Sequence, residues 1–333
     1  MSQKNLDAEN EASLIELRLA ELEEERRRLT AGLTRLRREM DSPAPAQTVR
    51  EAAASYQVHH LSSSDEKIRL FRSLFRGRED VYPRRWENLK AGRSGYSPAC
   101  RNEWMPGVCK KPKVKCGDCP SREFLPVTDA VIRDPLVGHT PNSTRDFTIG
   151  VYPLLPDETC WFLAVDFDKR TWPDDARAFV DTCRDHGVPA ILERSRSGNG
   201  AHAWIFFSAP VAAVTARRIG TWMITETMER HPEIGFESYD RLFPNQDTLP
   251  TGGFGNLIAL PLQGRSRKSG NSVFIDSELV PLEDQWLYLS QIDRLPPQSV
   301  QIAVNAPDEA YLVGEAGFTE WDALPSTLVG SRA

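Results

Sequence analysis

The stretch "FLAVDFDK", residues 162–169, decides the fold, because it reads as a buried β-strand that ends in two carboxylates. Successive side chains of a strand point to opposite faces, so Asp166 and Asp168 project side by side from one face. Carboxylates held this close repel each other, and each raises the pKa of the other unless a cation neutralises them. The pattern therefore predicts a divalent metal at the end of this strand. The alternative is a structural ion-pair site in which Lys169 and Arg170 neutralise the acids.

Segments with strand character alternate with helical segments from residue 147 onwards. We predict strands at 147–152, 160–167, 189–194, 202–207, 256–262 and 272–276, and helices at 174–186 and 210–231. Ser208 is the expected N-cap of the second helix, and Pro210 lies in its first turn. Several connections are too short for the crossover helices that join parallel strands. The fold class is therefore α+β with a largely antiparallel sheet.

The stretch "ERSRSGNGAHAWIFF", residues 193–207, follows after one helix. Gly198 and Gly200 predict a turn that brings backbone N–H groups close to an anion, and Ser197, Arg194 and Arg196 add donors. His202 then begins an apolar strand, on the face that also carries Trp204 and Phe206. We expect this histidine to contact a triphosphate held by the turn. A lone histidine is more often a hydrogen-bonded structural residue, which is the alternative here.

A third acid would complete a site for two metal ions, because two carboxylates supply too few ligands. The stretch "FESYDRLFPNQDTL", residues 236–249, offers Glu237, Asp240 and Asp247. Asp240 is the first choice because it lies in a short β-like segment, and Asp247 is the second. A later basic loop carries three further candidates for binding a triphosphate or a template backbone, with a solvated loop as the alternative: Arg265, Arg267 and Lys268.

Four cysteines lie within the stretch "CRNEWMPGVCKKPKVKCGDC", residues 100–119. Closely spaced thiols in a reducing compartment favour a structural zinc ion bound by Cys100, Cys109, Cys116 and Cys119. The eight residues between the first two cysteines are longer than a usual zinc knuckle, and redox or incidental cysteines are the alternative. The lysines between the two halves, with Trp104, form a candidate nucleic-acid contact; otherwise they are a solvated charge run.

Composition places the chain among ordinary soluble proteins, with 333 residues, 40% hydrophobic and 26% charged. We find no run of eighteen apolar residues and no signal-peptide pattern, so we expect a cytoplasmic protein without a membrane partner. The formal net charge of −6 argues weakly against a nucleic-acid partner. Its distribution matters more, since basic residues gather beside the cysteines and in the segments 194–200 and 264–270.

The order of these motifs resembles the archaeo-eukaryotic primases: "DFD" on a strand, then "SGNGAH" entering a strand, then a later acid. More specifically, "GYSPACRNEW", "CGDC", "AVDFDK" and "SYDRLFPNQDTLPTGGFGNLIALPLQ" resemble the primase domain of TOTE conflict systems and the related CRISPR-associated primase-polymerases. The resemblance covers about residues 65–290. A His-Leu-x-Gly stretch is expected upstream, and the chain has "RDPLVGHT" instead. TOTE proteins also carry helicase and nuclease modules, so we expect either a stand-alone enzyme or a fragment.

The resemblance implies an RRM-like catalytic sheet and a template-dependent nucleotidyltransferase, a DNA primase or polymerase. It implies that Asp166, Asp168 and one of Asp240 or Asp247 bind Mg²⁺ or Mn²⁺, with His202 and Ser197 at the nucleoside triphosphate. The template would be single-stranded DNA or RNA. A metal-dependent nuclease is a second hypothesis, and it would not need the His202 turn. A catalytically inactive, zinc-containing adaptor is a third, and it would bind single strands without metal dependence.

The N-terminal region has a heptad repeat over residues 8–40. Apolar side chains follow one seam at alternating spacings of four and three, with Arg26 at the seam position between Leu22 and Leu29: Ile15, Leu19, Leu22, Leu29, Leu33, Leu36 and Met40. Charged residues flank the seam, which is typical of a coiled coil that self-associates or binds a partner protein. The alternative is a helix folded back on the body of the protein.

These patterns divide the chain into five segments. They are a coiled-coil helix (1–40), a linker (41–60), the N-terminal part of the primase domain with the zinc motif (61–146), the catalytic core (147–291) and a tail or linker (292–333). A serine cluster at 62–64 predicts a short helix that opens the main domain.

Overall fold

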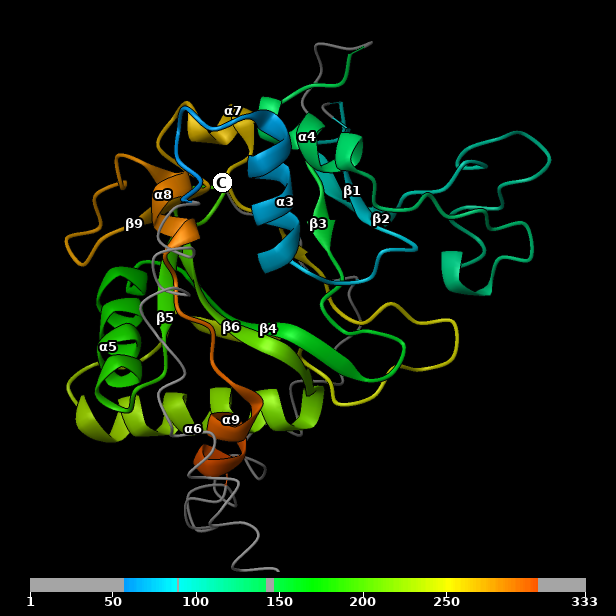
Figure 1. Cartoon of the computed structure of the whole chain (residues 1–333). Coiled ribbons are helices and arrows are strands. Elements are labelled where there is room, and N and C mark those ends of the chain that lie inside the picture. The colour runs from blue at the N-terminus through cyan, green and yellow to red at the C-terminus, as the bar shows by residue number, and fades with distance from the viewer. Residues whose placement is uncertain (1–56, 89, 142–146, 305–333) are drawn as a thin grey trace, which may run out of the picture. The chain divides into compact units, whose positions relative to one another are not determined.

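A five-stranded antiparallel sheet with the order β7-β4-β6-β5-β9 is the centre of the fold (Figure 1). The computed structural model describes residues 57–88, 90–141 and 147–304. The predicted coiled coil and most of the predicted linker lie outside the described residues, as do residues 305–333. The described residues from Val58 onwards belong to one compact unit. The predicted α+β class with a largely antiparallel sheet is confirmed.

The described helices and strands follow one another in this chain order: α3 (Ser64–Leu74), β1 (Pro83–Asn88), β2 (Arg93–Pro98), η1 (Cys116–Asp118), α4 (Asp129–Val137), β3 (Gly150–Val151), β4 (Thr159–Asp168), α5 (Trp172–Asp185), β5 (Ala190–Arg194), β6 (Gly200–Ala212), α6 (Ala213–Arg230), β7 (Tyr239–Phe243), β8 (Ile258–Ala259), α7 (Gly264–Arg267), β9 (Val273–Ile275), α8 (Gln285–Ser290) and α9 (Pro297–Val304). Outside the central sheet, β1 pairs with β2 and β3 pairs with β8. None of the helices in the described ranges has the length and the apolar run that a bilayer requires.

The two faces of the central sheet are covered by different elements (Figure 1). Helices α5 and α6 cover one face, where the rings of Phe167 and Phe179 lie 5.6 Å apart. Helix α3 covers part of the other face, and its neighbour Phe75 packs edge-on against Trp204 and Phe206. Aromatic burial of this kind supplies much of the free energy that holds the layers together. The acids of β4 project from the face that Phe75 covers. Asp166 pairs with His202, and His202 lies on the same face of β6 as Trp204, which Phe75 contacts.

Helix α3 begins where the serine cluster predicts it. Ser63 is the N-cap, its side chain accepts from the backbone N–H of Glu66, and the Glu66 carboxylate accepts from the backbone N–H of Ser63. This reciprocal pair is a capping box, which satisfies donors at the helix start. Ile68, Phe71 and Leu74 form the buried stripe of the helix.

Helix α6 begins later than predicted. We expected Pro210 in its first turn, but β6 continues to Ala212 and the helix begins at Ala213. The start of β4 pairs with this extension, with Thr159 opposite Ala212. Cross-strand pairing therefore overrides the local helix signal. Further along, α9 packs on α6, and Leu295 and Val300 are buried within the segment assigned to a tail.

The segment "RDPLVGHT" forms the end of α4 and its cap. Pro135 lies inside the helix, and the helix ends at Gly138, which adopts the left-handed conformation with φ of 97°. The side chain of His139 is exposed just beyond this cap. In the expected His-Leu-x-Gly stretch the histidine precedes the leucine, and in this chain Pro135 of α4 occupies that position.

Candidate active site

Three carboxylates converge on the face of the sheet next to β6. Strand β4 carries Asp166 and Asp168, and β7 carries Asp240. Each of the three offers a carboxylate oxygen, and these oxygens lie within 4.8 Å of one another. Oxygen donors at this spacing suit Mg²⁺ or Mn²⁺, which prefer carboxylates. The donor set therefore fits a hard divalent cation.

Burial and mutual repulsion make the acid cluster electrostatically costly without a cation. Burial, together with the charges of Asp168 and Asp240, raises the pKa of Asp166 to about 6 against the opposing charge of His202. Burial and Asp240 also raise the pKa of Asp168. Arg241 partly compensates, since its Nε donates to the Asp240 carboxylate at 2.6 Å. The cluster holds three acids near one arginine and one histidine. The acids outnumber these two basic groups, so a bound cation would stabilise the cluster.

His202 is fixed between the acid cluster and a buried glutamate. Its Nδ1 lies 2.9 Å from Oε2 of Glu193, and its Nε2 lies 3.6 Å from Oδ1 of Asp166. The indole Nε1 of Trp204 donates to the same Glu193 oxygen at 2.9 Å. Burial would lower the pKa of His202, but the charge and hydrogen bond of Glu193, together with Asp166 and Asp168, raise it to about 9. The ring thus presents Nε2 to the cluster in a fixed orientation.

The turn before β6 brings its backbone against β4. Gly198 has φ of +82°, a conformation that favours glycine. A Cβ at Gly200 would lie 2.4 Å from the Phe167 carbonyl oxygen and 2.6 Å from Oδ1 of Asp168, so a side chain cannot fit there. The Ser197 hydroxyl accepts from the backbone N–H of Asn199 at 3.2 Å. The predicted turn therefore lies directly beside the acids.

A second buried carboxylate places the third acid. Oδ2 of Asp175, at the start of α5, accepts from both the backbone N–H and the hydroxyl of Ser238, at 3.0 and 2.6 Å. The Ser238 carbonyl oxygen in turn accepts from the backbone N–H of Asp168 at 2.7 Å. These bonds tie the entrance of β7 to the end of β4, and they hold Asp240 next to the other two acids.

Asp247, the second choice for the third acid, lies elsewhere. Its carboxylate forms an ion pair with Arg217 of α6 at 2.8 Å. The geometry thus brings Asp240 rather than Asp247 to the pair on β4. Two further positions on β5 and α5, Glu193 and Asp175, support the site and were not predicted. Glu193 had one signal, a charged residue in the apolar strand that pairs with β6, where it lies opposite His202.

The predicted basic residues separate into two groups. Arg267 is directed away from the acids, because it donates to the Leu136 carbonyl oxygen at 3.1 Å, and burial lowers its pKa. Arg194 likewise donates to two backbone carbonyl oxygens. Arg265 and Lys268 are exposed. The charges of Arg196 and Arg265 both act on Glu87 of the β1–β2 hairpin, so this hairpin lies near the turn and α7.

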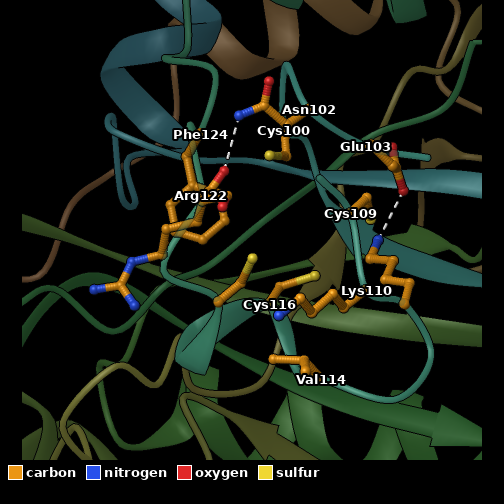
Figure 2. Close-up of a pocket in the computed structure, with 12 residues that line it drawn as sticks. Cys100, Asn102, Glu103, Cys109, Lys110, Val114, Cys116, Arg122 and Phe124 are labelled. Carbon is orange, nitrogen blue, oxygen red and sulfur yellow. Dashed lines mark hydrogen bonds and ion pairs between the residues drawn. The ribbon is translucent and has the colours of Figure 1, made fainter. Parts of the chain in front are cut away.

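The four cysteines line one pocket in a lobe formed by residues 100–124 (Figure 2). Glu103 anchors the lobe, with its carboxylate at 2.8 Å from Lys111 Nζ and 2.6 Å from Arg84. Burial raises the pKa of the Cys116 thiol, and the charge of Lys111 opposes this rise. Thiolates are the ligands that zinc prefers. Among the described residues, however, the cysteines do not form a set of three whose ligand atoms lie within 4.8 Å of one another. The donor set fits zinc, but the thiols do not converge.

Comparison with known families gives one match over most of the chain. Residues 66–303 match the family model described as TOTE conflict system, Archaeo-Eukaryotic Primase domain. No curated protein matches the chain. A similar solved structure is the polymerase domain from Mycobacterium tuberculosis Ligase D in complex with DNA, at 12% identity and a TM-score of 0.32, with 76% of this chain and 92% of that chain covered. A likeness at this TM-score supports no conclusion about the site.

Proposed function

This chain belongs to the family of TOTE conflict system archaeo-eukaryotic primase domains, and on that premise we propose that it is a template-dependent nucleotidyltransferase, a primase-polymerase. Its substrates would be nucleoside triphosphates, and its template single-stranded DNA or RNA. The observation that carries the proposal is the convergence of Asp166, Asp168 and Asp240 beside His202. In the reaction, a sugar hydroxyl attacks the α-phosphate of the incoming nucleotide and pyrophosphate leaves.

The three acids would hold the catalytic Mg²⁺ or Mn²⁺, which would lower the pKa of the attacking hydroxyl and neutralise charge on the leaving pyrophosphate. Burial and the neighbouring carboxylates raise the pKa values of Asp166 and Asp168, and a bound cation would offset this cost of ionisation. Arg241 orients the Asp240 carboxylate through its 2.6 Å hydrogen bond.

His202 would contact the triphosphate from the side of β6. Glu193 orients the ring by accepting from Nδ1, so that Nε2 faces the acids and the space where the phosphates would lie. A protonated imidazole is a charge-assisted donor to a phosphate oxygen, which is a stronger hydrogen bond than a neutral one. A nuclease has no requirement for a triphosphate contact, so this histidine favours the polymerase over the nuclease hypothesis.

The glycine turn would complete the nucleotide site. Gly200 of this turn lies against Asp168, and the charges of Arg196 and Arg265 both act on Glu87 of the neighbouring hairpin. We also assign Lys268 to the outer part of this site, since its side chain is exposed. Arg267 is not part of it, because its guanidinium is used within the fold.

The cysteine lobe would bind a structural zinc ion through Cys100, Cys109, Cys116 and Cys119. Four thiolates leave no coordination position for a substrate, so this metal would have no catalytic role. The pocket that the four cysteines line supports the proposal. The coiled coil proposed for residues 1–40 would mediate self-association or bind a partner, and a place in a TOTE or CRISPR system follows from the family resemblance.

The test is primer synthesis and primer extension on a single-stranded DNA template, with all nucleotides and either Mg²⁺ or Mn²⁺. The wild-type chain should extend an annealed primer, and product without a primer would identify a primase. The Asp166→Ala/Asp168→Ala variant should lose at least about three orders of magnitude of rate, since the cations contribute several kcal/mol. If the wild type binds the template but neither chain makes product, the adaptor hypothesis replaces this proposal.

A further inference from the structure

Two arginines and a tryptophan lie together at the end of β4 opposite to the acids. The Cζ atom of Arg76 lies 4.0 Å from the centre of the Trp161 ring, so the guanidinium stacks on the indole. Arg76 follows α3 directly and is exposed, while its neighbour Phe75 is buried against Trp204 of β6. The stack is thereby held next to the sheet face that carries the acids.

Arg294 adds a second cation to this place. Its guanidinium donates to the Ser73 hydroxyl of α3 at 2.8 Å. Burial and the nearby charge of Arg76 both lower the pKa of Arg294, which places the two cations within electrostatic range. Within the described ranges, neither arginine forms an ion pair with a carboxylate, whereas most arginines of the sheet's other face do. Two like charges without an acid favour an anion between them.

Strand β6 is irregular opposite Trp161. Cys160 pairs with Val211, but Phe162 pairs with Phe206, so residues 207–210 of β6 lie opposite the single residue Trp161 of β4. Bulges of this kind are common next to functional sites. Trp161 thus has no regular cross-strand neighbour on β6, and its ring lies against Arg76.

We propose that Arg76, Arg294 and Trp161 form a binding surface for the phosphate backbone of a single nucleic-acid strand that leads away from the acid cluster. The choice of a nucleic-acid strand as the ligand rests on the proposed function, because a polymerase must hold a strand beyond its reacting end. Guanidinium groups bind phosphate through paired hydrogen bonds, and an aromatic ring beside them stacks a base. Five residues of β4 separate Trp161 from Asp166, about 17 Å, which a strand with about five stacked nucleotides would span.

The experiment measures binding of a fluorescein-labelled single-stranded DNA oligonucleotide by anisotropy, over a range of salt concentrations. The full chain is used without nucleotides and without divalent cations. Each of Arg76→Ala and Arg294→Ala should weaken binding about tenfold, as for a lost hydrogen bond to a charged group. The double variant should also lower the slope of log affinity against log salt by about 1.4, because each lost phosphate contact contributes about 0.7 for single strands.

Arg230→Ala is the matched control, because it removes the same charge from α6 on the opposite face of the sheet, where Asp185 and Glu226 pair with it. It should change neither affinity nor slope. Arg76→Lys should keep the slope and lose part of the affinity, since lysine keeps the charge but not the planar stack. This variant also guards against misfolding as the cause of a loss.

The proposal is overturned if the Arg76→Ala/Arg294→Ala variant matches Arg230→Ala in affinity and slope, or if the wild-type chain does not bind the oligonucleotide. The catalytic proposal fails separately. If the wild type binds the oligonucleotide through these arginines but synthesises nothing, the proposed binding surface stands and the proposed polymerase activity is wrong.

Discussion

The acid cluster and the cysteine lobe differ in how their ligand atoms are positioned. In the acid cluster, backbone pairing between β4, β6 and β7 sets the side chains, and carboxylate oxygens of all three acids lie within 4.8 Å of one another. In the cysteine lobe, four thiols line one pocket without converging in this way. The difference indicates that strand pairing can hold repelling carboxylates close together, whereas the loops of the lobe do not bring their thiols equally close.

Burial explains the contrast. Strand β4 is almost entirely buried from Phe162 to Phe167, so its packing offsets the repulsion between the acids. The lobe has no buried residue between Cys100 and Phe124, and its described regular structure is the short helix η1 and one bridge between those two residues. A segment without a core is commonly stabilised by a metal or a disulfide. We therefore expect metal to affect catalysis at one site and folding at the other.

The largest effect should separate the two candidates for the third acid. Asp240→Asn removes a carboxylate from the cluster and should lower the extension rate about a thousandfold, since a metal ligand contributes several kcal/mol. Asp247→Asn removes only a partly exposed ion pair with Arg217 and should change the rate less than about threefold. Single-turnover extension at saturating template measures both. The reverse order would show that the observed sheet geometry does not describe the active state.

A smaller effect is expected for Glu193→Gln. The amide keeps the shape but loses the charge that orients His202, so nucleotide-dependent extension should fall about tenfold to a hundredfold, as for other groups that orient a ligand. If Glu193 orients His202, the variant should have a higher KM for the nucleotide and an unchanged affinity for the template. A merely structural role would not produce this combination. Glu193→Asp should restore part of the loss. Equal losses in template affinity would instead indicate a general packing defect.

Removal of zinc should affect the lobe more than the sheet. After treatment with a thiol-reactive metal-release reagent, or in Cys116→Ser, protease cleavage should begin between residues 100 and 124, while primer extension falls about tenfold or less. Metal analysis of the wild type should find one zinc per chain. Cys183→Ser, at a buried thiol outside the lobe, is the control. If the lobe resists protease after the metal is removed, zinc does not stabilise it and the expected difference between the two sites is wrong.

The smallest effect concerns pH and stability without metal. Burial raises the pKa of Asp166 to about 6 in the folded chain, so its ionisation destabilises the fold as pH rises from about 4 through 6, by at most about 3 kcal/mol. His202, with its raised pKa, adds a loss above about pH 6.5 in the same direction. Mn²⁺ should therefore raise the melting temperature more at about pH 7.5 than at about pH 5.5.

Asp166→Asn is the variant that tests this last prediction. It should melt at a higher temperature than the wild type at about pH 7.5 without metal, because it removes the buried charge, and Mn²⁺ should stabilise it little. A variant that melts lower than the wild type would show that the carboxylate is not destabilising in the folded chain.

Much of the fold could be predicted from the local pattern. The strand at 160–167 and the helix at 174–186 match β4 and α5 within two residues, because apolar periodicity and turn residues act over short distances. The start of α6 was wrong because a long-range strand pair decided it. The β1–β2 hairpin carried mostly polar residues and gave no clear alternation.

The residue types by themselves determined which chemical groups are present and how they are spaced along the chain: two acids one residue apart on a strand, a histidine after a glycine turn, and four closely spaced thiols. The tertiary structure decided which residues meet. It selected Asp240 over Asp247, placed Glu193 behind His202, and turned Arg267 into the fold. The physical reason is that side-chain type follows from a single position, whereas proximity across strands depends on register and burial, which the whole chain sets together.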